Sequence, residues 1–270
     1  MTTKRNNKEL KFPTYDVIKK LEFLRSQSAS KNDVVQANRY WRLLESFKLY
    51  DIYYNFFISI KNHDYRKAWC QLEECELKCD NIIENSSTEF LLKFKVITIQ
   101  KIVEQWQALY PYTLFVSPEY KIKRYSCSIC GCNIKPRNRC SHKKGILYNG
   151  EICFHIIDDF EILSFSIVTN PVQKYSVIHN DDTLNFTHLD FLIDKLEYPL
   201  EEWSFKKNTI KHSIDKFHSI EKDSLCPCNS KAVFKDCCIN KKEILLPNFD
   251  FIFNKNLSPS EEVYYSNEKL

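Results

Sequence analysis

Four cysteines in the C-terminal third of the chain have the spacing of a metal site. Cys226 and Cys228 form one close pair, and Cys237 and Cys238 form a second pair after a short polar stretch. Zn²⁺ prefers sulfur ligands and takes four of them in a tetrahedron, without a directional demand of its own d-electrons. Two close thiolate pairs on either side of a short turn can converge on one such ion, so this spacing predicts a zinc site.

Residues 226–238 also resemble the SEC-C motif, a small zinc hook named after the C-terminus of the translocase motor SecA. That motif reads Cys-Pro-Cys-Gly-Ser-Gly, then a basic-aromatic stretch, then Cys-Cys or Cys-His. Here Asn229 and Lys231 stand at the two glycine positions, and Phe234 supplies the aromatic residue. Because Lys adopts a left-handed backbone poorly, the chain departs most from the motif at Lys231. The resemblance implies a zinc-held docking element that contacts protein or ribosome, and it implies no reaction.

A second group of cysteines lies in the middle of the chain. Cys127 and Cys130 have the Cys-x-x-Cys spacing of a zinc-knuckle half-site, and Gly131 permits the tight turn that follows. Cys140 and His142 form the best second half, which gives a site of three cysteines and one histidine. We therefore expect two zinc ions per chain, one in each cluster, and both closed in the manner of structural zinc.

The remaining cysteines have other expected roles. Cys153, on the far arm of a predicted hairpin, is an alternative ligand to either Cys140 or His142, and the sequence leaves that choice open. We interpret Cys132 as a bystander. The three cysteines of the helix predicted at residues 64–82 are interpreted as core filler, because a reduced, buried cysteine behaves as a small apolar residue.

The central cluster lies in a basic window that spans residues 120–150. This window contains no Asp or Glu, holds all three glycines of the chain, and carries eight basic side chains, which exceeds what one thiolate cluster needs for charge balance. If the protein binds nucleic acid, we expect five of them to contact phosphates. These five are Lys135, Arg137, Arg139, Lys143 and Lys144.

Length and composition predict a globular protein of one to two domains. The chain has 270 residues, of which 43% are hydrophobic and 14% aromatic, and its net charge is +4. It shows no membrane-spanning run and no signal-peptide pattern, and its twelve cysteines suit metal binding in a reducing compartment, so we expect a cytoplasmic protein. It has no P-loop, no dinucleotide-binding glycine pattern and no His-Glu-x-x-His, which argues against several common enzyme classes.

Apolar periodicity predicts an α+β protein that is mainly helical. Helices are expected at residues 17–24, 43–60, 64–82, 88–110, 189–196 and 209–217. Strands are expected at residues 114–116, 162–168 and 172–178, with a hairpin at 146–154 around the turn Asn149-Gly150. These elements predict four parts: a helical bundle at 14–112, a zinc knuckle with a small antiparallel β-region at 113–216, a SEC-C zinc-binding motif at 224–240 and a C-terminal tail at 241–270. A linker at 217–224 is expected to lead into the hook.

Residues 40–238 as a whole resemble a group of bacterial proteins that carry the SEC-C motif. The likeness rests on a helical N-terminal half and on four short stretches. These are a Cys-Ser-Ile-Cys-Gly knuckle at 127–131, a Cys-x-His at 140–142, a Tyr-x-Gly-Glu-x-Cys hairpin at 148–153 and a Ser-Ile-Val-x-Asn-Pro turn at 166–171. The resemblance brings no established activity.

The sequence favours a zinc-binding adaptor that docks to protein, ribosome or nucleic acid through metal-held surfaces, with no membrane partner. The competing class is an enzyme that acts on nucleic acid, such as a toxin or phage-defence effector, for which we identify no catalytic residues. The acidic groups at 158–161 and 181–182 lack the flanking lysine and fixed strand context of a metal-nuclease site. An enzyme would need carboxylates or histidines of the helical half to converge on a pocket beside the basic knuckle.

Overall fold

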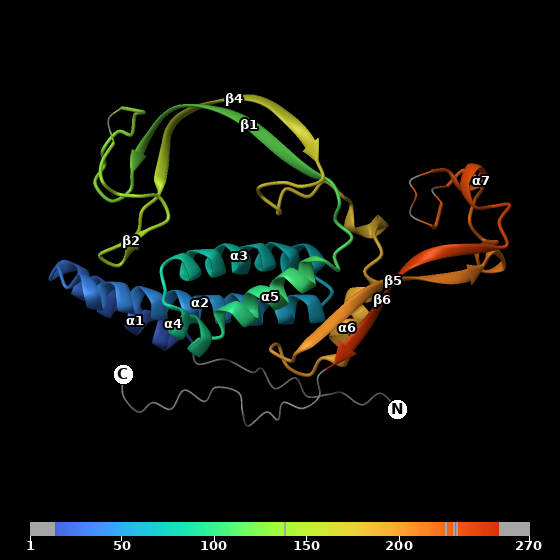
Figure 1. Cartoon of the computed structure of the whole chain (residues 1–270), viewed down its shortest axis with the longest axis horizontal. Coiled ribbons are helices and arrows are strands. Elements are labelled where there is room, and N and C mark those ends of the chain that lie inside the picture. Colours follow the sequence, from blue (N-terminus) through green and yellow to red (C-terminus); the bar gives the residue numbers. More distant parts are fainter. Residues whose placement is uncertain (1–13, 138, 225, 229, 231, 254–270) are drawn as a thin grey trace. The chain divides into compact units, whose positions relative to one another are not determined.

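A computed structural model describes residues 14–253, apart from residues 138, 225, 229 and 231. Helices fill the N-terminal part and antiparallel strand pairs follow, which confirms the mixed α and β class with a helical N-terminus (Figure 1). The chain divides into two compact units, residues 1–195 and residues 196–270. Within the described residues, no helix is both long enough and apolar enough to cross a membrane.

Three long helices open the first unit. They are α1 (Thr14–Ser30), α2 (Val34–Lys61) and α3 (Tyr65–Glu84), and α2 packs against both of its neighbours. Asp33 and Asp64 precede α2 and α3, and each carboxylate accepts a hydrogen bond from a backbone N–H in the first turn of its helix. The helices predicted at 17–24, 43–60 and 64–82 are confirmed.

The fourth predicted helix is present but broken. It begins as predicted, because the Ser87 hydroxyl accepts a hydrogen bond from a backbone N–H of α4 (Thr88–Lys93). Lys95 then adopts a left-handed backbone with a φ of 47°, and α5 (Val96–Gln107) starts afresh. The break leaves Leu92 exposed, although a continuous helix would place it on the apolar face. Packing in the bundle therefore overrides the local pattern.

A long antiparallel ribbon of two strands follows the helices. β1 (Phe115–Cys127) pairs with β4 (His155–Val168), so the strands predicted at 114–116 and 162–168 are much longer than expected. Three irregularities in the register interrupt the ladder, and Figure 1 shows both strands as one curved ribbon. The sequence pattern underestimated the ribbon because the alternation of apolar and polar residues, clear from Val116 to Ile122, is interrupted by these irregularities.

Both ends of this ribbon are attached to the helices. At one end the hairpin of β2 (Leu147–Tyr148) and β3 (Glu151–Ile152) turns at Asn149-Gly150 as predicted and lies against α2. At the other end the Phe115 ring lies beside Trp69 of α3, with ring centroids 6.3 Å apart. The bundle therefore fixes the two ends of the ribbon and leaves its middle exposed.

Residues 172–178, which were predicted as a strand, form only an isolated bridge between Val177 and Phe115 among the described residues. Backbone hydrogen bonds join Ser176 and Ile178 to the start of β1, and side chains of α3 hold the first half of the segment. Trp69 Nε1 donates a hydrogen bond to the Lys174 carbonyl at 2.6 Å, and the Glu73 carboxylate accepts one from the Lys174 N–H at 2.6 Å. These contacts satisfy backbone groups that a partner strand would otherwise satisfy.

The first unit ends with the short helix η1 (Asp181–Thr183) and with α6 (Thr187–Lys195), which confirms the helix predicted at 189–196.

The second unit is a hairpin with a long insertion at its tip. β5 (Trp203–Ser213) pairs with β6 (Glu243–Phe253) in continuous register, and the insertion holds η2 (Ile214–Phe217) and α7 (Phe234–Cys237).

The structure of this unit differs from the sequence predictions at three places. The helix expected at 209–217 is strand as far as residue 213, because pairing with a distant segment overrides the local helical pattern. The tail expected from residue 241 begins with β6, whereas residues 254–270 lie outside the described residues. The expected linker at 217–224 is also packed, since Phe217 and Ile220 contact a small core that contains Phe234 and Ile244. The four-part division of the chain stays a prediction.

Candidate metal centres

The central cluster comes together at the end of the ribbon where β1 stops. The ligand atoms of Cys127, Cys130, Cys140 and His142 all lie within 4.8 Å of one another. Four such atoms at this mutual separation can surround a single ion. The structure therefore brings together the two half-sites that the sequence proposed, and this cluster could hold a metal ion.

A tight turn shapes the first half-site. Gly131 has a φ of 68°, in the left-handed region that glycine adopts without a side-chain clash, and its N–H donates to the Cys127 carbonyl at 2.8 Å. The Cys127 N–H in turn donates to the Cys132 carbonyl at 2.9 Å. Cys132 thus contributes its backbone to the turn, and its sulfur lies outside the group of four ligand atoms.

The Cys127 sulfur lies in surroundings that favour the thiolate. Loss of hydration raises the pKa of this buried thiol, but hydrogen bonds from the N–H groups of Cys130 and Ile129 and from the thiols of Cys153 and Cys140 outweigh it and lower the pKa to about 6. A thiolate is the form of cysteine that binds a metal ion. At neutral pH Cys127 is therefore mainly a thiolate, which can bind a metal cation.

Cys153, the alternative ligand, lies next to this group but outside it. Its Sγ is 3.6 Å from the Sγ of Cys127, and the residue is fully buried. Loss of hydration, reinforced by the negative charge of Cys127, raises the pKa of Cys153 to about 11. Cys153 is therefore suited to donate its S–H to the Cys127 thiolate.

The His142 ring has a nitrogen that lacks a partner. Its Nδ1 is buried and has no hydrogen-bond partner among the described residues. The ring meets Tyr148 of β2 edge-on, with centroids 4.7 Å apart and an interplanar angle of 86°. A buried ring nitrogen without a partner costs free energy. A metal ion that this nitrogen bound beside the three sulfurs would remove that cost, so the residues present fit such an ion.

Two asparagines that sequence reasoning missed hold the hairpin behind this cluster. Asn38 of α2 accepts a hydrogen bond from the Gly150 N–H at 2.7 Å, and Asn85, at the end of α3, donates to the Gly145 carbonyl at 2.8 Å. A side chain at Gly150 would meet Ala37 at 3.3 Å, so the close approach needs glycine. The concentration of all three glycines in this window was the sequence signal of such a close approach.

The second cluster lies in the insertion at the tip of the β5–β6 hairpin. The sulfurs of Cys226, Cys228, Cys237 and Cys238 all lie within 4.8 Å of one another, and this cluster too could hold a metal ion. The Cys226 N–H closes the intervening turn by donating to the Ala232 carbonyl at 2.8 Å. Asn229 and Lys231, where the chain departs from the SEC-C motif, lie outside the described residues.

This cluster also contains one acidic thiol. Hydrogen bonds to Ser230 lower the pKa of Cys228 to about 6, against the opposing effect of lost hydration. Loss of hydration raises the pKa of Cys226 to about 12. The Lys241 ammonium is hydrogen-bonded to Cys238, and this contact raises the pKa of Lys241. The second cluster therefore also contains one thiol that ionises readily, Cys228, beside a thiol that keeps its proton, Cys226, and a nearby cation, Lys241.

A basic pocket of about 430 Å³ opens beside the central cluster. Lys135, Arg139, Lys143 and Lys144 line it together with Cys140 and His142 themselves, and no Asp or Glu is among its lining residues. Arg137, the fifth predicted contact, is exposed but lies outside this lining. The lining also includes two rings that sequence reasoning did not pair: Tyr125 and His155 stack with centroids 5.3 Å apart and an interplanar angle of 21°.

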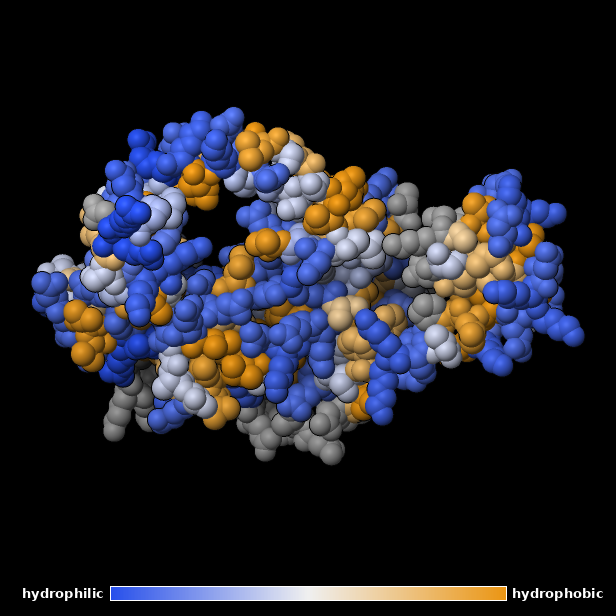
Figure 2. Space-filling view, turned by 45° about the horizontal axis from the view of Figure 1, so that its top comes forward, coloured by the Kyte–Doolittle hydropathy of each residue, from blue (hydrophilic) through white to orange (hydrophobic). Residues whose placement is uncertain are grey.

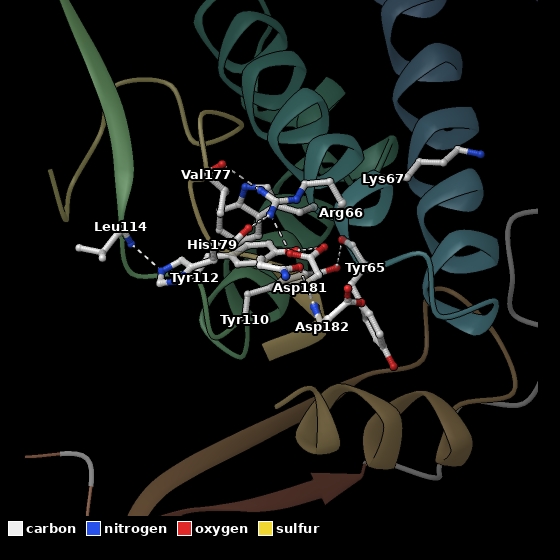
Figure 3. Close-up of polar contacts among 12 residues, drawn as sticks. Tyr65, Arg66, Lys67, Tyr110, Tyr112, Leu114, Val177, His179, Asp181 and Asp182 are labelled. Carbon is white, nitrogen blue, oxygen red and sulfur yellow. Dashed lines mark hydrogen bonds and ion pairs between the residues drawn. The ribbon is translucent and has the colours of Figure 1, made fainter. Parts of the chain in front are cut away.

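The acidic residues weighed for an enzyme lie elsewhere. Figure 3 shows Asp181 between Arg66 and Tyr112: Arg66 Nη2 lies 2.7 Å from one carboxylate oxygen, and the Tyr112 hydroxyl donates to the other at 3.0 Å. Arg66 also donates to the Val177 and His179 carbonyls. Asp181 therefore fastens the chain after residue 177 to the start of α3. On the ribbon, Asp158 accepts a hydrogen bond from Ser126 and Glu161 pairs with Lys123.

Comparisons with known proteins returned nothing: no protein-family profile, no curated protein and no solved structure matched the chain. The fold and the two clusters thus define a class, a mixed α and β protein whose described residues include two groups that could bind metal ions.

Proposed function

We propose that the protein is a zinc-organised binding module whose central cluster shapes a basic pocket for single-stranded nucleic acid. The pocket beside Cys140 and His142 carries the proposal, because four of its lining side chains are basic and none is acidic. Phosphate groups are the ligands that such a pocket attracts most strongly.

Zinc is the ion that best suits both clusters. One cluster offers three sulfurs and an imidazole and the other offers four sulfurs, which are ligand sets that favour zinc over oxygen-preferring cations such as Mg²⁺ or Ca²⁺. Each set fills a tetrahedron without an open position, which is typical of structural zinc. In this proposal the ligands of the central ion are Cys127, Cys130, Cys140 and His142.

The charge balance favours binding of phosphates over simple neutralisation. Three thiolates around one Zn²⁺ leave a net charge of about minus one. Four cations line the pocket beside that ion, so most of their charge remains to attract an anion. The stacked Tyr125 and His155 offer an aromatic surface in the same pocket, and unpaired bases stack on such surfaces irrespective of sequence.

The residues that line the pocket favour a binding module over an enzyme. All of its lining residues fall within 125–155, and none of the described lining residues belongs to the helices. Three of the five carboxylates considered for a nuclease, Asp181, Asp158 and Glu161, pair with Arg66, Ser126 and Lys123 instead. For this reason we favour binding over catalysis. We further propose that the second cluster is a zinc hook like that of SEC-C, which supplies a docking element for protein or ribosome.

Binding of a labelled single-stranded RNA, measured by fluorescence anisotropy over a series of salt concentrations, tests the proposal. The variant carries Lys135→Glu, Arg139→Glu and Lys143→Glu. The loss of three phosphate contacts should weaken binding at low salt at least about tenfold and reduce the slope of log K against log salt by about two. Zinc content should not change, since none of the three is a ligand.

Two controls sharpen this experiment. A variant with Lys19→Glu, Lys20→Glu and Lys31→Glu changes the same charge at exposed positions in and after α1 and should bind more tightly than the pocket variant. Arg137→Glu, outside the pocket lining, should cost less affinity than Arg139→Glu. Equal affinity of the wild-type protein and the pocket variant, or an equal loss in both triple variants, would refute the assignment of the pocket.

A further inference from the structure

The β1–β4 ribbon has one apolar face and one polar face. On one face the cross-strand pairs are Val116–Ile167, Pro118–Phe165, Tyr120–Ile162 and Ile122–Phe160. On the other face they are Ser117–Ser166, Glu119–Ser164, Lys121–Glu161 and Arg124–Asp159. Residues paired across two strands share a face, so the four apolar pairs form a continuous surface without a charge.

This apolar face is exposed in the described part of the chain. Six of its side chains are exposed by 46% or more: Tyr120, Ile122, Phe160, Ile162, Phe165 and Ile167. Figure 2 shows apolar side chains among hydrophilic ones on the ribbon, the arch at the top of the view. Within the described residues no third strand pairs with β1 or β4, and β1 makes only isolated bridges at its two ends, from Phe115 to Val177 and from Ser126 to Asn133. A two-stranded ribbon is marginally stable unless another surface packs against it.

The size of the face approaches what a dimer needs. Large side chains offer roughly 150–250 Å² each, so the exposed fractions of these six, 46–69%, amount to about 500–800 Å². Stable protein interfaces bury about 800 Å² on each partner. The largest apolar patch on a typical monomer is about 300–600 Å², so this face lies at or above the upper end of what a monomer leaves uncovered.

The character of the face favours a second copy of the same chain. Homodimer interfaces are more apolar than other interfaces and are depleted of charged residues at their centre. An uncharged face can pack against an identical face about a two-fold axis without placing like charges together. We propose that two copies of this chain associate ribbon against ribbon through this face. Such a dimer carries two copies of the basic pocket, so a longer nucleic acid can bind both.

Light scattering of the full-length protein after size exclusion tests the proposal with a matched pair of variants. Phe165→Lys with Ile167→Lys places two charges on the apolar face of β4, and Ser164→Lys with Ser166→Lys places two on the polar face of the same strand. The wild-type protein and the serine variant should have twice the chain mass of 32.2 kDa, and the apolar-face variant should have the single mass. Two buried lysines should raise the dimer dissociation constant at least about a hundredfold.

A wild-type protein of single mass at every concentration would overturn the proposal, and so would a dimer that survives in both variants. If the apolar-face variant does not fold, photo-crosslinking of the otherwise unchanged chain decides. A photoreactive phenylalanine at Phe160 should give a covalent dimer joined to β1 or β4 of the other copy, whereas one at Glu161 should not. An adduct within the same chain, or no dimer from position 160, would contradict a ribbon-to-ribbon contact.

Discussion

The sulfurs of Cys127 and Cys153 lie 3.6 Å apart, which joins the central cluster to the hairpin that docks on the helices. The two thiols have opposite tendencies, since the pKa of Cys127 is lowered to about 6 and that of Cys153 is raised to about 11. A thiol that keeps its proton beside a thiolate acts as a hydrogen-bond donor. Cys127 can therefore act as a ligand while Cys153 donates a hydrogen bond to its sulfur.

This relationship predicts different outcomes at Cys153 and Cys140. Cys153→Ser keeps a donor beside Cys127 and should retain the central zinc, with some loss of stability from a buried hydroxyl. Cys140→Ser removes a ligand, so the central zinc should be lost and the loop between the half-sites should become sensitive to protease. Zinc content of the purified variants checks this. Retention of zinc in Cys140→Ser together with its loss in Cys153→Ser would instead make Cys153 the ligand.

Substitution of a cysteine outside both clusters provides a control for the loss of stability in the ligand variants. Cys75 is fully buried in α3, and loss of hydration raises its pKa, so it packs as an apolar residue. Cys75→Ala should cost about 1–2 kcal/mol of stability and leave both zinc ions in place. Thermal unfolding of Cys75→Ala and Cys127→Ser compares the two. An equally large loss in both variants would show that Cys127 contributes no more than packing.

The insertion between β5 and β6 should be removable without loss of the first unit. Ser213 lies opposite Glu243, so replacing residues 214–242 by Asn-Gly closes the ladder with a two-residue turn. A truncation at Phe217 would instead remove β6 and leave β5 without a partner. We expect the excised protein to retain one zinc ion and the cooperative melting of its helices. An insoluble product would show that the insertion is needed for folding of the rest.

Glu73 provides a prediction on pH. Burial raises the pKa of this carboxyl, partly offset by the N–H groups of Lys174 and Tyr175. The pKa of Glu73 is higher in the folded state than in the unfolded state, where it is about 4.3, so the folded protein binds the proton more tightly. The contribution of Glu73 to stability is therefore greatest below the unfolded pKa and falls as pH rises through the folded pKa. Glu73→Gln removes this titration and keeps an acceptor for the Lys174 N–H.

Chemical unfolding at several pH values tests whether the contribution of Glu73 to stability falls as pH rises. Glu73→Gln should show a flatter dependence of the unfolding free energy on pH than the wild-type protein. Glu73→Ala leaves the half-buried Lys174 N–H without this acceptor and should cost about 1 kcal/mol more than Glu73→Gln. An unchanged pH slope in Glu73→Gln, or equal stability of the two variants, would contradict the role assigned to this carboxylate.

Local signals in the sequence predicted local structure well. The start of the fourth predicted helix at residue 88 and the Asn149-Gly150 turn each depend on a few adjacent residues, and the structure has both. The break at Lys95 and the pairing of β5 with β6 depend on packing between distant segments, and no short window contains that information.

In the candidate sites, too, the sequence predicted features that depend on nearby residues and missed those that depend on distant segments. The cysteine spacing was enough to group each set of four ligand atoms, because each set lies within a short stretch of chain. The contacts of Asn38 and Asn85 with the hairpin and the stacking of Tyr125 on His155 join segments that are distant in sequence. Only the fold could place these groups around the cluster.

Elemental analysis of the purified protein tests the central claim most directly. The account predicts two zinc ions per chain, and one each in Cys127→Ser and Cys228→Ser, because each substitution opens one closed tetrahedron. Two zinc ions in both variants would show that neither cysteine is a ligand. A single zinc ion in the wild-type protein, or iron in a coloured cluster, would contradict the account.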